Sequence, residues 1–204
     1  MRSRSIDALW MFSAVCAALT LAASVTIGLG AKQSGIDAAL AATARLMFLL
    51  FWPAYSGGAL VALFGAVFQP LKQHAREFGL AFASALLVHL GLVAVLCLIG
   101  AAPDAATFVF FGIGAAWAYV LALFSIPRLR LALGPRNWWL LSNVGMNYVA
   151  YAFIVDFLQQ PLHGGVKHII EYLPFAVLSL AGPGLRLAAY MQRIGRSWRN
   201  SSDR

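Results

Sequence analysis

Hydrophobic residues in this chain gather in long runs, separated by short segments that carry most of the charges. About 20 consecutive apolar residues are enough to cross the hydrocarbon core of a bilayer as an α-helix. Runs that approach or exceed this length cover approximately residues 8–29, 45–68, 78–100, 107–126, 140–158 and 168–190. The pattern predicts an all-α fold, a polytopic membrane bundle of six transmembrane helices that forms a single domain over residues 1–204.

Composition agrees with a membrane protein. Hydrophobic residues make up 61% of the chain and charged residues only 11%, with a mean hydropathy of +0.78, so we expect no separate water-soluble catalytic domain. The net charge is +8, but the basic residues lie between and after the apolar runs instead of in one patch. They are typical of topology signals and lipid-headgroup contacts. We expect the lipid bilayer as a partner and no nucleic acid.

The distribution of positive charge predicts the orientation. If both termini are cytoplasmic, all but three of the 15 Lys and Arg residues fall on the cytoplasmic side, the exceptions being Lys32, Arg45 and Lys167. Such a bias follows the positive-inside rule and favours six spans with both termini inside. The first run is longer than the 7–15-residue apolar core of a signal peptide, so we expect it to be a retained helix.

The third run carries an ionisable residue, His89, near its middle. Such a group is costly in lipid unless it faces the bundle interior, a ligand or water. On a helix, Ala81 and Ala85 lie on the same side as His89, which makes the surface low beside the imidazole. Two interpretations stay open. Another helix approaches closely and His89 hydrogen-bonds across the contact, or the dip admits a flat cofactor with His89 as axial ligand.

The fifth run is the most polar of the six. Asn143, Asn147 and Tyr151 recur every four residues and share one helical face, which favours hydrogen bonds between helices. Asp156 lies near the far end of the same run. No Walker-type loop, HExxH motif or clustered Cys/His spacing occurs in the sequence. The remaining histidines are expected in loops or at the membrane interface, and they are His74, His163 and His168.

Several short motifs occur in a suggestive order. Pro70-Leu71 follows the second run, and Arg76-x-x-Gly79 comes next, with His89 ten residues beyond. A basic segment, Leu133-Gly134-Pro135-Arg136-Asn137-Trp138, then leads into the fifth run. With six runs in about 200 residues, this order resembles the ferric reductase-like transmembrane family from the second span through the fifth. Within that family it is most similar to the bacterial heme-b membrane subunits that supply electrons to a periplasmic methionine sulfoxide reductase.

The resemblance implies a b-type heme between the third and fifth spans of a bacterial inner-membrane protein, with His89 as a ligand of the heme iron. The fifth span departs from the family, which has one histidine after a Trp-x-x-Leu entry and another thirteen residues later. Here the first position is Ser142 or Asn143 and the second is Val155 or Asp156. Neither Asn nor Asp is a usual axial ligand. The standard bis-histidine site is therefore lost.

Three outcomes stay open for the heme. It is absent and the fold serves another role, it is bound by His89 alone, or a thioether such as that of Met146 completes the site. Without heme, Asp156 is a candidate partner of His89, directly or through water. The two function classes are a heme protein for transmembrane electron transfer and a heme-free helper subunit or small transporter. The chain has no FAD or NAD(P) segment, so an oxidoreductase subunit of this kind would receive electrons from quinone or a separate redox protein.

Overall fold

The computed structural model describes residues 2–30, 32–163 and 166–202, and the side chains of residues 5–30, 32–159 and 172–195. Over these residues the chain forms helices and no strands, which confirms the all-α prediction. The elements are α1 Arg2–Leu29, α2 Gln33–Phe64, η1 Ala66–Phe68, α3 Gln69–Gln73, α4 Ala75–Leu98, α5 Ala105–Phe124, α6 Pro127–Leu133, α7 Pro135–His163 and α8 Val166–Ser202.

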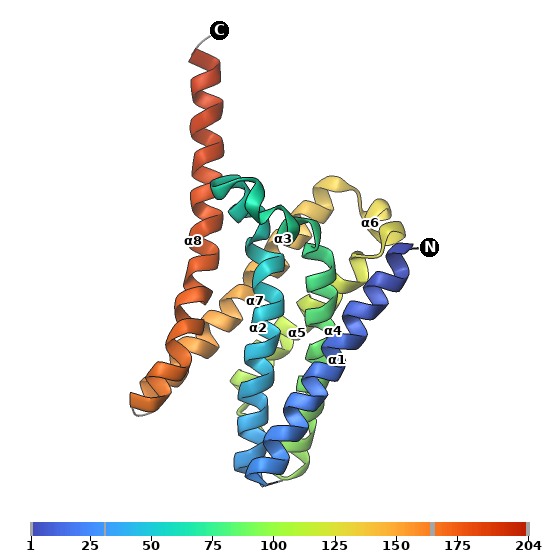
Figure 1. Ribbon diagram of the computed structural model, residues 1–204, viewed down its shortest axis with the longest axis vertical. Coiled ribbons are helices and arrows are strands. Elements are labelled where there is room, and N and C mark those ends of the chain that lie inside the picture. Colours follow the sequence, from blue (N-terminus) through green and yellow to red (C-terminus); the bar gives the residue numbers. More distant parts are fainter. Residues whose placement is uncertain (1, 31, 164–165, 203–204) are drawn as a thin grey trace.

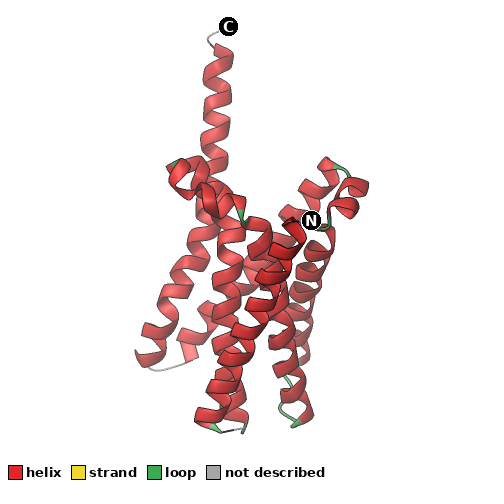
Figure 2. Cartoon of the chain, turned by 45° about the vertical axis from the view of Figure 1, so that its right-hand side comes forward, coloured by secondary structure: helices red, strands yellow, loops and turns green. Residues whose placement is uncertain are grey.

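The long helices form one bundle (Figures 1 and 2). The helices α1, α2 and α4 pack on one another, whereas α5 packs on α7, and α8 packs on α2 and α7. The short helices α3 and α6 lie at the end of the bundle where α1 begins and toward which α8 runs (Figure 1). The connections from α1 to α2 and from α4 to α5 lie at the opposite end. The first and last described helices therefore have their outer termini on the same side.

Within the described part of the chain, five helices are long and apolar enough to cross a membrane, as judged by length and composition. They are Ser5–Leu29, Gln33–Phe64, Ala75–Leu98, Ala105–Phe124 and Tyr172–Gly195. The sequence is thus that of an integral, multi-pass membrane protein. The predicted span 140–158 lies inside α7, which is helical over 29 residues but is not among the five. Asn143, Asn147 and Asp156 lower its hydropathy.

The second span differs from its predicted bounds. The helix α2 begins at Gln33, well before Arg45, because the intervening residues are rich in alanine, a strong helix former. It ends at Gly65, whose φ of +84° is a left-handed conformation that glycine adopts without steric cost. Pro70, which follows the predicted second run, lies in the first turn of α3, where a missing amide hydrogen is tolerated.

The last predicted span, 168–190, falls within α8, which continues to Ser202. The side chains of His163, Lys167 and His168 lie outside the described residues. The predicted spans 8–29, 78–100 and 107–126 match α1, α4 and α5, apart from small shifts at their ends.

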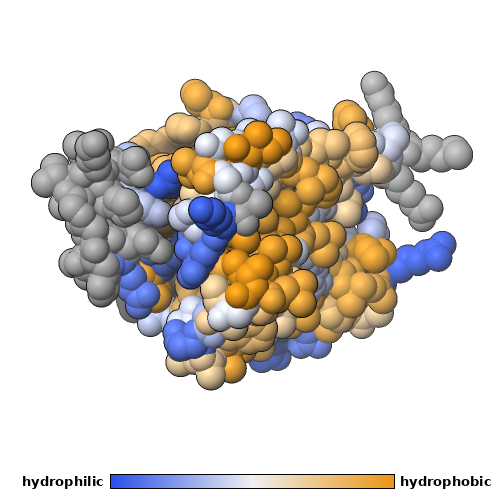
Figure 3. All heavy atoms as spheres, turned by 90° about the horizontal axis from the view of Figure 1, so that it is seen from below, coloured by the Kyte–Doolittle hydropathy of each residue, from blue (hydrophilic) through white to orange (hydrophobic). Residues whose placement is uncertain are grey.

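Small and aromatic side chains make up the interior. Ala81 and Ala85 of α4 are both 0% exposed and lie in the same core cluster as Ala18 of α1. Phe48 of α2 packs against Phe157 of α7 with a ring-centroid distance of 5.0 Å. Many large hydrophobic side chains are instead exposed on the outside of the bundle, and they form a broad part of the surface seen from the end opposite to α3 and α6 (Figure 3). This exterior suits contact with lipid.

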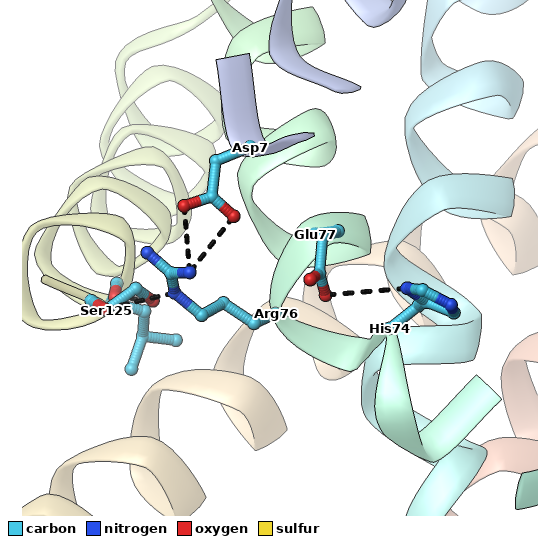
Figure 4. A network of polar contacts seen from close by, with 6 residues as sticks. Asp7, His74, Arg76, Glu77 and Ser125 are labelled. Atoms are coloured by element: carbon cyan, nitrogen blue, oxygen red, sulfur yellow. Dashed lines mark hydrogen bonds and ion pairs between the residues drawn. The ribbon is translucent and has the colours of Figure 1, made fainter. Parts of the chain in front are cut away.

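An ion pair connects helices at the end of the bundle that carries α3 and α6. Arg76 at the start of α4 donates to Asp7 of α1, with its Nη1 at 2.8 Å from Oδ2, and its Nε donates to the carbonyl oxygen of Ser125 at 3.2 Å (Figure 4). Asp7 is buried. In the same view, Glu77 points to His74, with 4.0 Å between Oε2 and Nδ1. Arg76 thus joins α1 and α4 to the chain just after α5.

At the opposite end, Asp104 caps the N-terminus of α5. Its carboxylate accepts hydrogen bonds from the backbone amides of Ala106 and Thr107 and from the Thr107 hydroxyl. The hydrogen bond from the Thr107 side chain is the main reason why the pKa of Asp104 is lowered, and the bonds from the two amides act in the same direction.

Candidate functional site

A cavity of about 1170 Å³ lies among α2, α4, α5 and α7, and His89 is one of its lining residues. It exists because α4 and α5 pack on different neighbours. Gly114 and Gly145 bring α5 and α7 together, since a Cβ at either position would touch a side chain of the other helix. Tyr148 of α7 also donates to the carbonyl oxygen of Phe110 at 3.0 Å. The cavity exceeds the ~300–1000 Å³ usual for small-molecule and cofactor sites.

His89 is held by Thr43 of α2, whose Oγ1 lies 2.9 Å from the imidazole Nδ1. Thr43 is 0% exposed, and its hydroxyl lies 2.9 Å from the carbonyl oxygen of Ala39 and 3.0 Å from that of Leu40. The hydroxyl has one proton and backbone carbonyls within reach as acceptors, so the direction of the hydrogen bond between Oγ1 and Nδ1 depends on the imidazole tautomer. With the proton on Nδ1, Oγ1 accepts from it, and Nε2, the ring nitrogen that Thr43 does not contact, is unprotonated.

The two interpretations of the His89 face can now be compared. Ala81 and Ala85 are fully buried in the contact with neighbouring helices and do not line the cavity. His89 hydrogen-bonds across this contact to α2. The close-packing interpretation is therefore confirmed, since the two alanines lie in the helix contact and the Nδ1 of His89 makes its hydrogen bond across it. The imidazole nevertheless lines a large cavity on its other side, which the alanine spacing did not indicate.

The cavity wall is mostly apolar, and its charged groups are acidic. Asp37 of α2 and Asp156 of α7 line it, whereas no Lys or Arg among the described side chains does. Two sulfur-containing residues, Met47 and Cys97, are also part of the wall. The site can therefore hold an apolar molecule, with an imidazole nitrogen as a ligating or hydrogen-bond-accepting atom and carboxylates as its negative charges.

Asp156, the candidate partner of His89, makes no direct contact with the imidazole. Both residues line the cavity, but the structure contains no ion pair between them. The positive charge that acts on Asp156 is that of Arg45, whose guanidinium carbon lies 4.5 Å from the ring centroid of Tyr172. Asp156 nonetheless stands at one of the two positions where the resembled family has its second fifth-span histidine, and this position does reach the cavity of His89.

Met146, the thioether named in one of the three outcomes for the heme, does not line the His89 cavity. It lines a second cavity toward the other end of the bundle, as does Ser142. We expected the polar face of α7 to join helices, and two of its three residues do so. Asn143 accepts a hydrogen bond from Arg186 of α8, and Asn147 accepts one from the Tyr55 hydroxyl at 2.7 Å.

Tyr151, the third member of that face, is exposed and packs on Phe110 of α5 with a ring-centroid distance of 5.7 Å. Its contact is thus aromatic and lies on the side of α7 that faces α5.

Sequence reasoning missed Thr43. The predicted second span began at Arg45, so a threonine two residues earlier lay outside the membrane and was not considered as a partner of an intramembrane histidine. The alanine-rich composition of residues 33–44 was the signal that could have extended the helix. With the helix extended, Thr43 becomes a polar residue at membrane depth that needs a partner.

The cavity offers one imidazole, so its residues fit a single histidine ligand for a heme and do not fit a bis-histidine site. The Nδ1 of His89 has a hydrogen-bond partner in Thr43, as one ring nitrogen of a metal-ligating histidine usually has. The described residues contain no group of three or more His, Cys, Asp or Glu side chains that could hold a metal ion on its own. His89 is the only histidine in the wall of the cavity formed by the described residues.

Comparisons of the chain with protein-family models, with curated proteins and with solved structures found no match. The resemblance to the ferric reductase-like family therefore stays a prediction from the sequence motifs.

Proposed function

We propose that this chain is a ferric reductase-like membrane protein that binds a planar apolar ligand, b-type heme, in the His89 cavity. The observation that carries the proposal is the orientation of His89. A buried threonine takes up Nδ1 at 2.9 Å, and the other ring nitrogen is left for a cavity of about 1170 Å³. The motif order of the sequence supports the family.

The proposal includes six spans with both termini cytoplasmic. The helix α7 has 29 residues, so its length is roughly 43 Å, more than the ~30 Å hydrocarbon core. It runs from the end with α6 to the opposite end (Figure 1). Its asparagines hydrogen-bond to α2 and α8, which makes a polar helix tolerable in a membrane. The positive-inside bias supports the orientation.

The chain's own residues have separate tasks at the site. His89 would supply Nε2 as the ligating atom, and the contact of Thr43 with Nδ1 would hold the ring in place. Phe82, Phe111 and Phe153 contribute apolar wall. A bound heme would supply one-electron transfer. Electrons would come from quinone or from a separate redox protein, because this chain carries no flavin or nicotinamide motif.

A heme-free role is a second candidate, and the charge of the cavity favours it. Heme carries two propionate groups, whereas the cavity wall contains Asp37 and Asp156 and no described Lys or Arg. An apolar molecule with a cationic or hydrogen-bond-donating group would match the wall better. The chain would then act as a helper subunit or small transporter.

A visible spectrum of the purified chain, before and after dithionite reduction, distinguishes the two candidates. Heme binding predicts a Soret band that shifts on reduction, is lost in His89→Ala, and is lost or reduced in Gly112→Leu, because Gly112 lines the cavity. Gly91→Leu is the matched control, since Gly91 also has open space where a Cβ would lie but is outside the cavity wall. A folded, colourless wild type, or a band unchanged in His89→Ala, contradicts the heme proposal and leaves the heme-free one.

A further inference from the structure

A second cavity, of about 340 Å³, lies toward the end of the bundle that carries α3 and α6. Its wall is built from α2, α3, α4, α5, α6 and α7. It differs from the His89 cavity in charge. Lys72, Arg76 and Arg130 line it, and no Asp or Glu among the described side chains does. Two cavities of opposite charge therefore lie at different depths in one bundle.

Two of the three cations are not neutralised. Arg76 is paired with the buried carboxylate of Asp7 at 2.8 Å, and its Nε is bonded to the carbonyl oxygen of Ser125 (Figure 4). Lys72 and Arg130 are exposed and make no ion pair with a described acidic side chain. The guanidinium carbon of Arg130 lies 5.5 Å from the ring centroid of Trp138, which also lines the cavity. The mouth thus has two available positive charges beside an interfacial tryptophan.

The inner wall of this cavity is apolar. Phe51 and Phe82 close it from α2 and α4, and Ala118 and Val149 do so from α5 and α7. All four are buried in the core. A free inorganic anion would gain nothing from such a wall, whereas a molecule with a negatively charged head and a hydrocarbon chain would use both parts.

The short helix α6 brings the mouth of the cavity to the membrane surface. Its Leu131 is 81% exposed and Ile126, just before it, is also exposed, which suits a segment embedded among lipid headgroups. Arg130 comes from the same helix. Basic pockets between transmembrane helices are the sites at which membrane proteins bind anionic lipid headgroups.

We propose that this second cavity binds an anionic phospholipid, with its phosphate at Lys72 and Arg130 and the start of an acyl chain against the apolar inner wall. Trp138 lies at the level of the headgroup. The proposal does not depend on the ligand of His89, because the two cavities differ in their charged residues and most of their walls.

Native mass spectrometry of the full chain in detergent tests the proposal, with dioctanoyl phosphatidylglycerol, dioctanoyl phosphatidylcholine and inorganic phosphate as separate probes. The test variant is Lys72→Gln/Arg130→Gln. The matched control is Lys32→Gln/Arg128→Gln, which removes the same charge from exposed residues outside the cavity wall. Lys72→Arg keeps the charge and serves as the conservative variant. Thermal unfolding of each variant shows that it is folded.

Phosphatidylglycerol should bind the wild type, the control and Lys72→Arg with similar affinity. It should bind the test variant about 30-fold more weakly, from about 1 kcal/mol per cation at an anionic lipid surface. Equal loss in the control variant, or equal binding of phosphatidylcholine and phosphatidylglycerol, overturns the proposal. Displacement of phosphatidylglycerol by inorganic phosphate at equal concentration also overturns it, because the site would then be one for a free anion.

Discussion

Replacement of Thr43 by valine tests how His89 is held. The side chain keeps its volume but loses the hydroxyl that lies 2.9 Å from the imidazole Nδ1. Thr43 is 0% exposed, so water cannot replace the lost partner. Hydrogen bonds between membrane helices are worth about 0.6 kcal/mol on average and at most about 1.7 kcal/mol, and an unsatisfied buried donor costs about 1–3 kcal/mol. We expect Thr43→Val to lower the free energy of unfolding by about 1–2 kcal/mol.

The assay is reversible unfolding in mixed detergent micelles, with helix content followed by circular dichroism. His89→Leu provides the second background, because it removes the donor that Thr43→Val leaves without a partner. In that background we expect Thr43→Val to cost less than about 0.5 kcal/mol, which gives a coupling energy of roughly 1 kcal/mol between the two residues.

Thr20→Val is the matched control. Thr20 also bonds to a backbone carbonyl of its own helix, that of Cys16 at 2.8 Å, but it is exposed and makes no hydrogen bond to another described helix. Its replacement should change the free energy of unfolding by less than about 0.5 kcal/mol. If Thr43→Val costs the same with and without His89, the cost comes from its own helix, and the reasoning about the imidazole fails.

Three further predictions concern the contacts between helices and one helix cap. Arg76→Met leaves the buried Asp7 carboxylate without its partner and should lower the free energy of unfolding by about 2–3 kcal/mol. This is less than the roughly 3–5 kcal/mol of a fully buried pair, because the Arg76 side chain is 35% exposed. An unchanged unfolding curve would contradict this prediction. Tyr55→Phe removes the hydroxyl that donates to α7 and should cost about 0.5–1.5 kcal/mol in the same assay, whereas Tyr151→Phe, an exposed tyrosine, should be neutral. Since its hydrogen bonds lower the pKa of Asp104 below the ordinary value of 3.8, the cap stabilises α5 above that pH and loses its effect as the pH falls through the lowered value. The stability difference between wild type and Asp104→Ala should therefore shrink in acid, and a pH-independent difference would contradict the assignment.

The apolar runs predicted the helices well, because a run of membrane length has few alternatives to a helix in lipid. Their ends were less predictable. The second span was placed from its first charge, Arg45, although a charged residue can lie inside a helix where the bundle supplies a partner, here the ring of Tyr172. Its far end was placed at Phe68, although Gly65 had already ended the helix by taking a positive φ.

The site was predicted only in part. A lone histidine at membrane depth indicated a polar partner across a helix contact, and Thr43 is that partner. The cavity beside it could not be read from the sequence, because it results from α4 and α5 packing on different neighbours. The positions of Met146 and Asp156 relative to this cavity could not be predicted either. Whether a residue of α7 faces the His89 cavity depends on the rotation of α7 in the bundle, which its sequence alone does not determine.

Nitrogen-15 NMR of the imidazole in selectively labelled protein tests most directly whether His89 presents a free basic nitrogen to its cavity. His89→Leu identifies the His89 signals among those of the four histidines. At neutral pH and without added ligand, we predict a protonated Nδ1 and an unprotonated Nε2 in the wild type, with this preference weakened in Thr43→Val. A wild-type ring with its proton on Nε2 would show that threonine donates to the imidazole, and a ligating role for His89 would then be contradicted.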